Sequence, residues 1–177
     1  PHISGVISIL QSALEPGEFD PALDSKVFRI SANDYLVATT ITELMVRLKE
    51  EGPNIDVRVI DRGVNTKKVY KALDTGEIDL AIGAYGEVPE RYGVFYIADT
   101  DFVCMMRSGH PLAEGKFTLK RFAKAKHLLV TPGGDAIGFV DEALAKANLS
   151  RRICLTVNHF SVVPALIART DMITTIP

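Results

Sequence analysis

The chain has 177 residues, of which 47% are hydrophobic and 24% are charged. This composition is typical of a folded globular protein and excludes a disordered chain, and the length suffices for one domain or two small lobes. The formal net charge of −2 and the isoelectric point near 6.1 provide no basic field for phosphates. We therefore expect this segment alone to bind nucleic acid poorly.

No stretch approaches the roughly 20 apolar residues of a membrane helix, and the start does not resemble a signal peptide. The chain begins at Pro1 rather than at methionine, which suggests a fragment or a processed form. Its two cysteines, Cys104 and Cys154, lie in apolar runs. So sparse a pattern predicts two buried thiols in a reducing cytosol rather than a disulfide framework.

The first apolar pattern predicts a helix. Ile3, Ile7, Leu10 and Leu14 are spaced by four, three and four residues, and the Glu-Pro-Gly sequence at 15–17 supplies a stop. Spacing alone leaves two interpretations open. The segment is either the tail of a dimerising linker helix or a surface helix that packs on its own domain.

Residues 28–83 alternate between strand and helix patterns. Asn33 or Asp34 can cap the first helix, which runs at helical apolar spacing until Gly52-Pro53. The short apolar segment 79–83 is typical of a strand buried on both faces. The predicted elements are strands at 28–32, 55–59 and 79–83, with helices between Asn33 and Gly52 and at 66–75.

A loop rich in glycine, proline and tyrosine spans 83–93 and opens the second half. The elements predicted after it are extended stretches at 94–97 and 102–106 with a crossover between lobes at 98–101, a short helix capped by Thr118, a strand at 127–130, a turn at 131–135, a helix around 140–147, a strand at 153–157, a helix from Ser161 to Ala168, and a strand at 172–176. Alternating strands and helices predict an α/β fold with parallel-rich sheets and helices on both faces.

The sequence offers no recognised catalytic or metal-binding constellation. Its four histidines show no metal-ligand spacing, and the G-x-S-x-G, HExxH and paired-cysteine motifs are absent. The glycine-rich loop 133–138 opens a helix but lacks the Lys-Ser/Thr pair of a phosphate-binding loop. We therefore expect structural histidines and predict neither an enzyme nor a metal or cofactor.

Four strand-to-helix junctions remain as a candidate binding site. In open α/β sheets, ligands bind beyond the carboxyl ends of the strands, where helix N-termini present unpaired N–H groups. The junctions lie at Ser31–Asn33, Asp61–Gly63, Thr131–Gly133 and Asn158–Ser161. Their hydroxyls, guanidinium and phenyl ring suit a small anionic or aromatic molecule. The alternative is that Ser31, Asn33 and Ser161 are helix caps only.

Several motifs carry a family resemblance. They are Phe19-Asp20-Pro21-Ala22 leading into Phe28-Arg29-Ile30-Ser31, Gly76-Glu77-Ile78-Asp79-Leu80-Ala81-Ile82-Gly83, Arg107-Ser108-Gly109-His110-Pro111-Leu112, and Thr174-Thr175-Ile176-Pro177. In this order and at these separations, the chain resembles the effector-binding domain of LysR-type transcriptional regulators over nearly all of its length. The Phe-Asp-Pro opening and Asn33-Asp34-Tyr35 are most similar to the branch of nodulation and aromatic-catabolism activators.

The resemblance implies a fold like that of type II periplasmic binding proteins, with two Rossmann-like lobes joined by crossover strands. It assigns residues 1–17 to the end of a linker helix, 18–98 to lobe I and 99–173 to lobe II. Residues 174–177 then begin a return to lobe I, whose C-terminal part is absent from this sequence. It also implies a cytoplasmic homodimer or tetramer that contacts DNA through an N-terminal domain outside this chain and does not bind membranes.

The resemblance also places effector contacts, since certain positions match places where family members touch their ligands. These predicted ligand-binding residues are Ser31, Asn33, Arg62, Phe102, Thr131 and Phe160. The sequence departs from the family at Thr40-Ile41-Thr42, where many members have Leu-Pro, so the first long helix is expected to begin earlier or to run without a kink.

Two other classes of protein stay open as alternatives. A secreted solute-binding protein of the same fold would carry an export signal upstream of Pro1. An enzyme of this fold would need a convergent acid, base or nucleophile, and the candidates Asp61, Arg62 and His159 form no recognised set.

Overall fold

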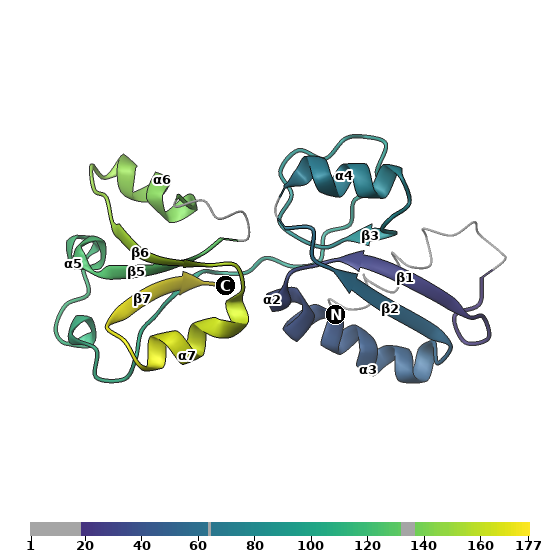
Figure 1. Cartoon of the computed structure of the whole chain (residues 1–177), viewed down its shortest axis with the longest axis horizontal. Coiled ribbons are helices and arrows are strands. Elements are labelled where there is room, and N and C mark those ends of the chain that lie inside the picture. Colours follow the sequence, from purple (N-terminus) through teal and green to yellow (C-terminus); the bar gives the residue numbers. More distant parts are fainter. Residues whose placement is uncertain (1–18, 64, 132–136) are drawn as a thin grey trace. The chain divides into compact units, whose positions relative to one another are not determined.

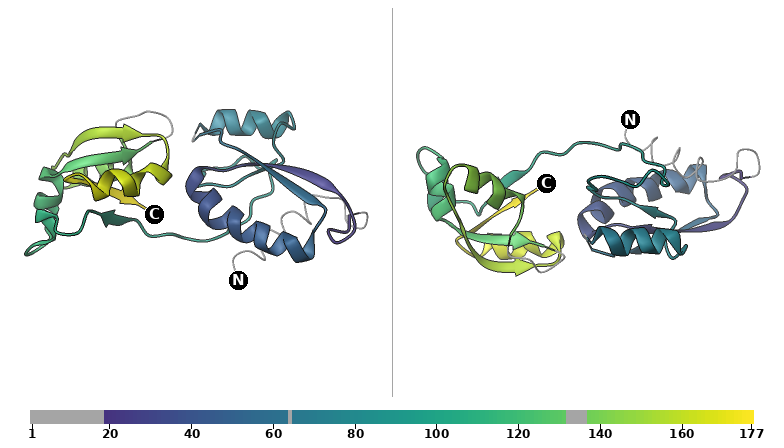
Figure 2. Two further views of the ribbon diagram at one scale, coloured as in Figure 1. Left: turned by 60° about the horizontal axis from the view of Figure 1, so that its bottom comes forward. Right: turned by 90° about the horizontal axis from the view of Figure 1, so that it is seen from above.

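The computed structural model of this protein describes residues 19–63, 65–131 and 137–177. The chain divides into two compact units, Pro1–Asp99 and Thr100–Pro177. Each unit has a sheet with helices packed on it (Figures 1 and 2). The helix predicted at residues 3–14 and most of the turn predicted at 131–135 lie outside the described residues.

The sheet of the first unit has three parallel strands in the order β2-β1-β3. These strands are β1 (Lys26–Ser31), β2 (Ile55–Ile60) and β3 (Leu80–Ala81). Ser31, at the end of β1, pairs with Ile60 on one side and with Ala81 on the other. The carboxyl ends of all three strands therefore meet at one edge of the sheet.

Helices cover both faces of this sheet (Figure 1). One face carries the continuous helical segment α2 (Asp34–Leu36), η1 (Val37–Ile41) and α3 (Thr42–Glu51), and the other carries α4 (Thr66–Asp74). The core under α3 consists of Phe28, Ile30, Ile41, Leu44, Leu48 and Ile55. The core under α4 consists of Val69, Ala72 and Ile78. This arrangement is the βαβαβ order that the sequence predicted.

The segment Thr40-Ile41-Thr42, where many members of the family have Leu-Pro, overlaps the end of a turn of π-helix, η1. The Thr42 hydroxyl donates to the carbonyl of Val37 at 2.9 Å, and the backbone N–H of Thr42 also reaches that carbonyl. A π-turn inserts an extra residue into the helix; such turns are rare and are frequently found at functional sites. The helix begins at Asp34, so the expectation of an early start is confirmed, although its path is not regular.

The second unit has a four-stranded sheet in the order β4-β7-β5-β6. Its strands are β4 (Val103–Met105), β5 (Lys126–Val130), β6 (Arg152–Val157) and β7 (Met172–Ile176). Strands β7, β5 and β6 are parallel, and β4 is antiparallel to β7. Its helices are η2 (Pro111–Ala113), α5 (Leu119–Lys124), α6 (Phe139–Lys146), η3 (Phe160–Val162) and α7 (Val163–Ala168).

Two apolar clusters lie on the two faces of this sheet. One joins β7 to η2, α5 and α6, and the other joins β5 to α7. The members of the first are Leu112, Phe122, Ala123, Leu144 and Ile173, and those of the second are Leu128, Val163 and Ile167. The predicted α/β class with parallel-rich sheets is thus confirmed.

Several local predictions are confirmed and others are wrong. Asn33 and Thr118 cap helices as expected. Ser161 does not, because it lies within η3, and Val162 occupies the N-cap position of α7. The strand expected at 79–83 is reduced to β3, which is partly exposed rather than buried on both faces, and 94–97 forms no strand.

The predicted burial of both cysteines holds only in part. Cys104 is half-buried and Cys154 is exposed on the edge strand β6, and both are free thiols. Along β6, exposed and partly buried residues alternate, and Cys154 is at an exposed position. The apolar composition of this stretch did not indicate which residues point outward. Among the described helices, none combines the length and apolar character needed to cross a membrane.

Candidate functional site

Three of the predicted ligand-binding residues lie at the carboxyl edge of the first sheet. Ser31 is the last residue of β1, Asn33 follows two positions later, and Arg62 lies two residues beyond β2. Because the strands are parallel, these positions share one edge. The edge is where ligands bind in open α/β sheets.

Each of these three side chains already has a partner within its unit. Ser31 is 3% exposed and its hydroxyl forms a hydrogen bond with that of Tyr85. The Asn33 Oδ1 accepts from the backbone N–H of Leu36 at 3.0 Å, so Asn33 is a helix cap. The Arg62 guanidinium pairs with Glu77 at 2.8 Å.

The other three predicted residues lie at the matching edge of the second sheet. Thr131 directly follows β5, is 9% exposed, and donates its backbone N–H to the Val157 carbonyl at 2.8 Å. Phe160 opens η3, three residues beyond β6. Phe102 directly precedes β4, whose first residue, Val103, lies opposite Ile176 at the end of antiparallel β7.

Phe102 contacts a residue that the sequence analysis did not select. Its ring lies edge-on to that of Phe139, with centroids 4.4 Å apart and an interplanar angle of 62°. Phe102 is 45% exposed and Phe139, the first residue of α6, is 54% exposed. The pair therefore forms an exposed aromatic surface at the edge of the second sheet. In the sequence, the only indication of a role for Phe139 was its position at the start of a predicted helix.

Tyr85 is a second residue that the sequence analysis missed. It lies in the loop that follows β3, and burial is the main cause that raises the pKa of its hydroxyl. The signal in the sequence was the glycine, proline and tyrosine-rich composition of residues 83–93 directly after a parallel strand. That composition predicted a loop but not the direction of any side chain.

Of the three candidates for catalysis, Asp61 and Arg62 are engaged in local structure, whereas His159 is exposed at the start of η3 and does not cap it. Asp61 accepts the backbone N–H of Gly63 at 2.7 Å, and Arg62 is paired with Glu77. His110 caps η2 by accepting the N–H of Leu112 at its Nδ1, and His127 is fully buried. Within residues 19–63, 65–131 and 137–177, no group of histidine, cysteine, aspartate and glutamate is arranged to hold a metal ion.

A known protein family and several characterised proteins match this chain. The LysR substrate binding domain family matches residues 21–177. The transcriptional activator NahR of Pseudomonas putida is 27% identical over 176 residues, which is 99% of this chain and 58% of NahR. The activator NagR of a Ralstonia species is 28% identical over 172 residues, or 97% of this chain and 56% of NagR. The chain thus spans a little over half the length of these relatives.

Solved structures show the same fold. A probable transcriptional regulator from Pseudomonas aeruginosa superposes with a TM-score of 0.79 at 26% identity, covering 98% of this chain and 59% of that one. The regulatory domain of MexT, an activator in Pseudomonas aeruginosa, gives 0.67 at 28% identity and covers 87% of this chain and 73% of that one. Because the family match extends over nearly the whole sequence, as the motifs indicated, the chain belongs to the family of LysR substrate-binding domains.

Proposed function

We propose that this chain is the effector-sensing part of a bacterial LysR-type transcriptional regulator. The observation that carries the proposal is the position of the six predicted residues, each of which lies at the carboxyl edge of the parallel strands of its unit. Family membership and the names of the relatives, which are transcriptional activators and regulators, support it. The regulator is a cytoplasmic protein that contacts DNA through an N-terminal domain outside this sequence.

The effector is a small organic acid or aromatic molecule, and each lobe offers candidate contacts for it. We assign residues 18–98 to lobe I and residues 99–173 to lobe II, and residues 174–176 complete β7 in the sheet of the second unit. Hydroxyl groups come from Ser31 and Thr131, an amide from Asn33 and a guanidinium from Arg62. Phe102 and Phe160 contribute apolar surface.

The regulatory step is a population shift in a homodimer or tetramer. An effector moves the equilibrium between two arrangements only by the difference in its affinity for them. A coupling free energy of about 1–3 kcal/mol, usual in allosteric proteins, changes populations roughly 5–150-fold. If the two arrangements differ in the spacing of the attached DNA-binding domains, a population change of this size suffices for a switch.

The alternatives are less well supported. A secreted solute-binding protein shares the fold, but the relatives that match nearly all of this chain carry regulator names. An enzyme needs a convergent acid, base or nucleophile, whereas Asp61 and Arg62 are held by their own loop and by Glu77.

The test is thermal unfolding of the chain with benzoate, shikimate and succinate as probes. A ligand that binds only the native state stabilises it by about 2.7 kcal/mol at 100 times its dissociation constant. We expect one probe to raise the melting temperature, and Ser31→Ala and Thr131→Ala to remove that rise. Ser150→Ala and Thr156→Ala, at exposed positions, are matched controls that retain it. An equal rise in all four variants would show that the ligand binds elsewhere.

A further inference from the structure

The side chain of Tyr85 folds back toward the carboxyl end of β1. The chain leaving β3 still pairs with that strand, since the N–H of Ile82 donates to the Ser31 carbonyl at 2.8 Å. A Cβ atom placed on Gly83 would lie 3.2 Å from Cε2 and Cζ of the Tyr85 ring. The ring therefore lies over Gly83, and the missing side chain at that position leaves the space it needs.

The Tyr85 hydroxyl lies among residues that end the other elements of the sheet. It is hydrogen-bonded to Ser31 of β1, and the charge of Asp61, which follows β2, contributes to raising its pKa. The ring packs on the core under α4, and the Tyr70 ring lies 6.4 Å away between centroids. Tyr85 thus has an anchored ring and a polar tip at the edge where Ser31 also lies.

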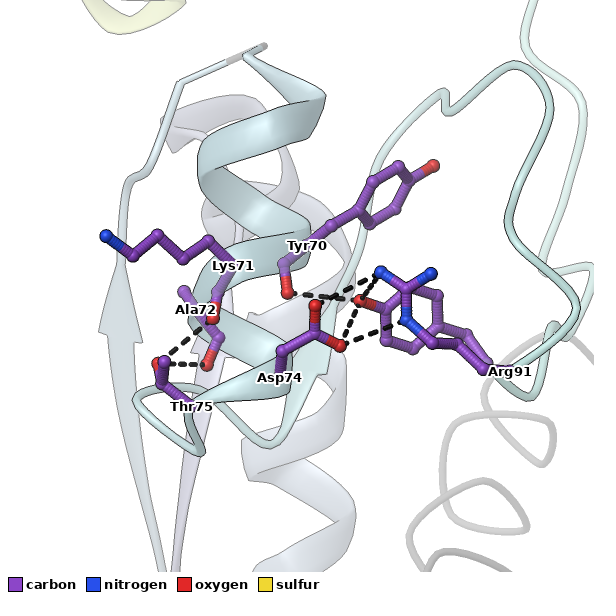
Figure 3. Close-up of polar contacts among 7 residues, drawn as sticks. Tyr70, Lys71, Ala72, Asp74, Thr75 and Arg91 are labelled. Carbon is purple, nitrogen blue, oxygen red and sulfur yellow. Dashed lines mark hydrogen bonds and ion pairs between the residues drawn. The ribbon is translucent and has the colours of Figure 1, made fainter.

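The loop that carries Tyr85 is tied to α4 by a polar network (Figure 3). Arg91 donates from Nε and Nη2 to the Asp74 carboxylate, both at 3.1 Å, and the Tyr92 hydroxyl lies 2.6 Å from Asp74 Oδ1. The rings of Tyr70 and Tyr92 stack at 5.3 Å, and the Tyr70 hydroxyl donates to the Glu87 carbonyl at 3.3 Å.

This network fixes the loop on α4, so that the loop can support Tyr85. Individually, exposed ion pairs and hydrogen bonds contribute little stability. Together they hold residues 87–92 of the loop against α4. Binding groups act best when their supports fix them before the ligand arrives. Tyr85 is therefore positioned in advance at the edge of the sheet.

The protonation state of Tyr85 defines what it can bind. Burial and the nearby charge of Asp61 raise the pKa of its phenol, and the hydrogen bond with Ser31 opposes this rise. At neutral pH the phenol keeps its proton. Because the Ser31 hydrogen bond acts to lower the pKa of Tyr85, Ser31 donates to the phenol oxygen, and the phenol proton remains available to an acceptor. A phenol donor suits an oxygen acceptor, and hydrogen bonds to a charged acceptor are the stronger ones.

We propose that Tyr85 is a further effector-binding residue, whose hydroxyl, held in place by Ser31, donates to a carboxylate of the effector. The inference rests on the proposed function. It adds a contact from the loop after β3 to the three strand-end residues of the first unit. It also identifies the part of the ligand that this unit recognises as an anionic oxygen.

The test compares the binding of benzoate, shikimate and succinate to the wild-type chain and to Tyr85→Phe by isothermal titration calorimetry. The variant keeps the ring and removes one hydroxyl, so its melting temperature without ligand is expected to stay near that of the wild type. We expect about tenfold weaker binding of the responding acid, which corresponds to about 1.4 kcal/mol. Tyr96→Phe, at a side chain that is 72% exposed, is the matched control and should bind as the wild type does.

A second readout comes from the tyrosines themselves, because the chain has five tyrosines and no tryptophan. The responding acid should produce a near-ultraviolet difference spectrum that Tyr85→Phe loses and Tyr96→Phe keeps. Unchanged affinity in Tyr85→Phe would overturn this inference while the proposed function stands. If none of the three acids binds the wild type, the proposed effector class and this inference fail together.

Discussion

Replacing Asp141 with asparagine removes the charged partner of a guanidinium that is almost wholly buried. The Arg151 side chain is 1% exposed and Asp141 is 21% exposed. Asp141 accepts from Nε and Nη2 of Arg151, both at 2.8 Å, and from the N–H of Gly138 at 2.7 Å, where α6 begins. These hydrogen bonds, chiefly those from Arg151, lower the pKa of Asp141.

The expected cost follows from what remains in the variant. Removing one member of a buried ion pair leaves an uncompensated charge and costs about 3–5 kcal/mol. Because Asp141 is partly exposed, the lower end of about 3 kcal/mol applies. With a denaturant slope near 2 kcal/mol/M, the midpoint of urea unfolding should fall by about 1.5 M. Far-ultraviolet circular dichroism measures that midpoint, and hydrogen exchange at β5 and β6 assigns the loss to the second unit.

The matched control is Glu51→Gln, the same chemical change at an exposed pair. Glu51 and Arg47 lie 2.8 Å apart, with side chains 45% and 31% exposed, and are spaced i,i+4 on α3. Such a pair contributes about 0.3–0.5 kcal/mol. If Asp141→Asn cost no more than Glu51→Gln, the Arg151 charge would not depend on its partner and the reasoning from burial would be refuted.

Two further predictions concern titration and reactivity. Burial is the main cause that lowers the pKa of His127, and it outweighs the opposing hydrogen bond with the Phe122 carbonyl. The folded state therefore favours neutral His127, whose stabilising contribution is complete above the ordinary pKa of about 6.5 and is lost as the pH falls below it. Urea unfolding between pH 7 and 5 should show this loss, and His127→Gln should flatten the slope; an unchanged slope would exclude His127 as its source. Iodoacetamide should label exposed Cys154 faster than Cys104, whose pKa is raised by burial, as followed by peptide mass spectrometry, and equal rates would contradict this difference.

The order of elements was predictable because long apolar patterns determine which segments pack. The spacing of Leu44 and Leu48 and the alternation around Val57 are satisfied only by a helix and a strand with buried faces, and both form. Caps were equally predictable where one short polar residue stands before a helix, as Thr118 does. The prediction that Ser161 caps a helix was wrong because a turn of 3-10 helix precedes α7, and residues within such a turn have no distinctive apolar period.

The candidate site was predictable only in its backbone framework. Strand ends follow from the apolar pattern, so Ser31 and Thr131 could be placed at sheet edges before the structure was known. The contact of Phe102 with Phe139 depends on the antiparallel pairing of β4 with β7, which no local pattern specifies. The position of Tyr85 depends on how the Arg91–Asp74 pair folds its loop onto α4, and this too is a contact between segments distant in sequence.

This division between framework and contacts explains why the family was easier to recognise than the effector. The core residues that define the two sheets need only be apolar and of suitable size, so the fold persists at 26% identity with a TM-score of 0.79. The residues at the sheet edges carry little of that core, and loops tolerate substitution without loss of the scaffold. A phenol at position 85 or a phenyl ring at position 139 can therefore change while β1 and α6 stay in place. The chemistry of the effector is then determined by the least constrained part of the chain, and must be read from the contacts of these side chains rather than from the fold.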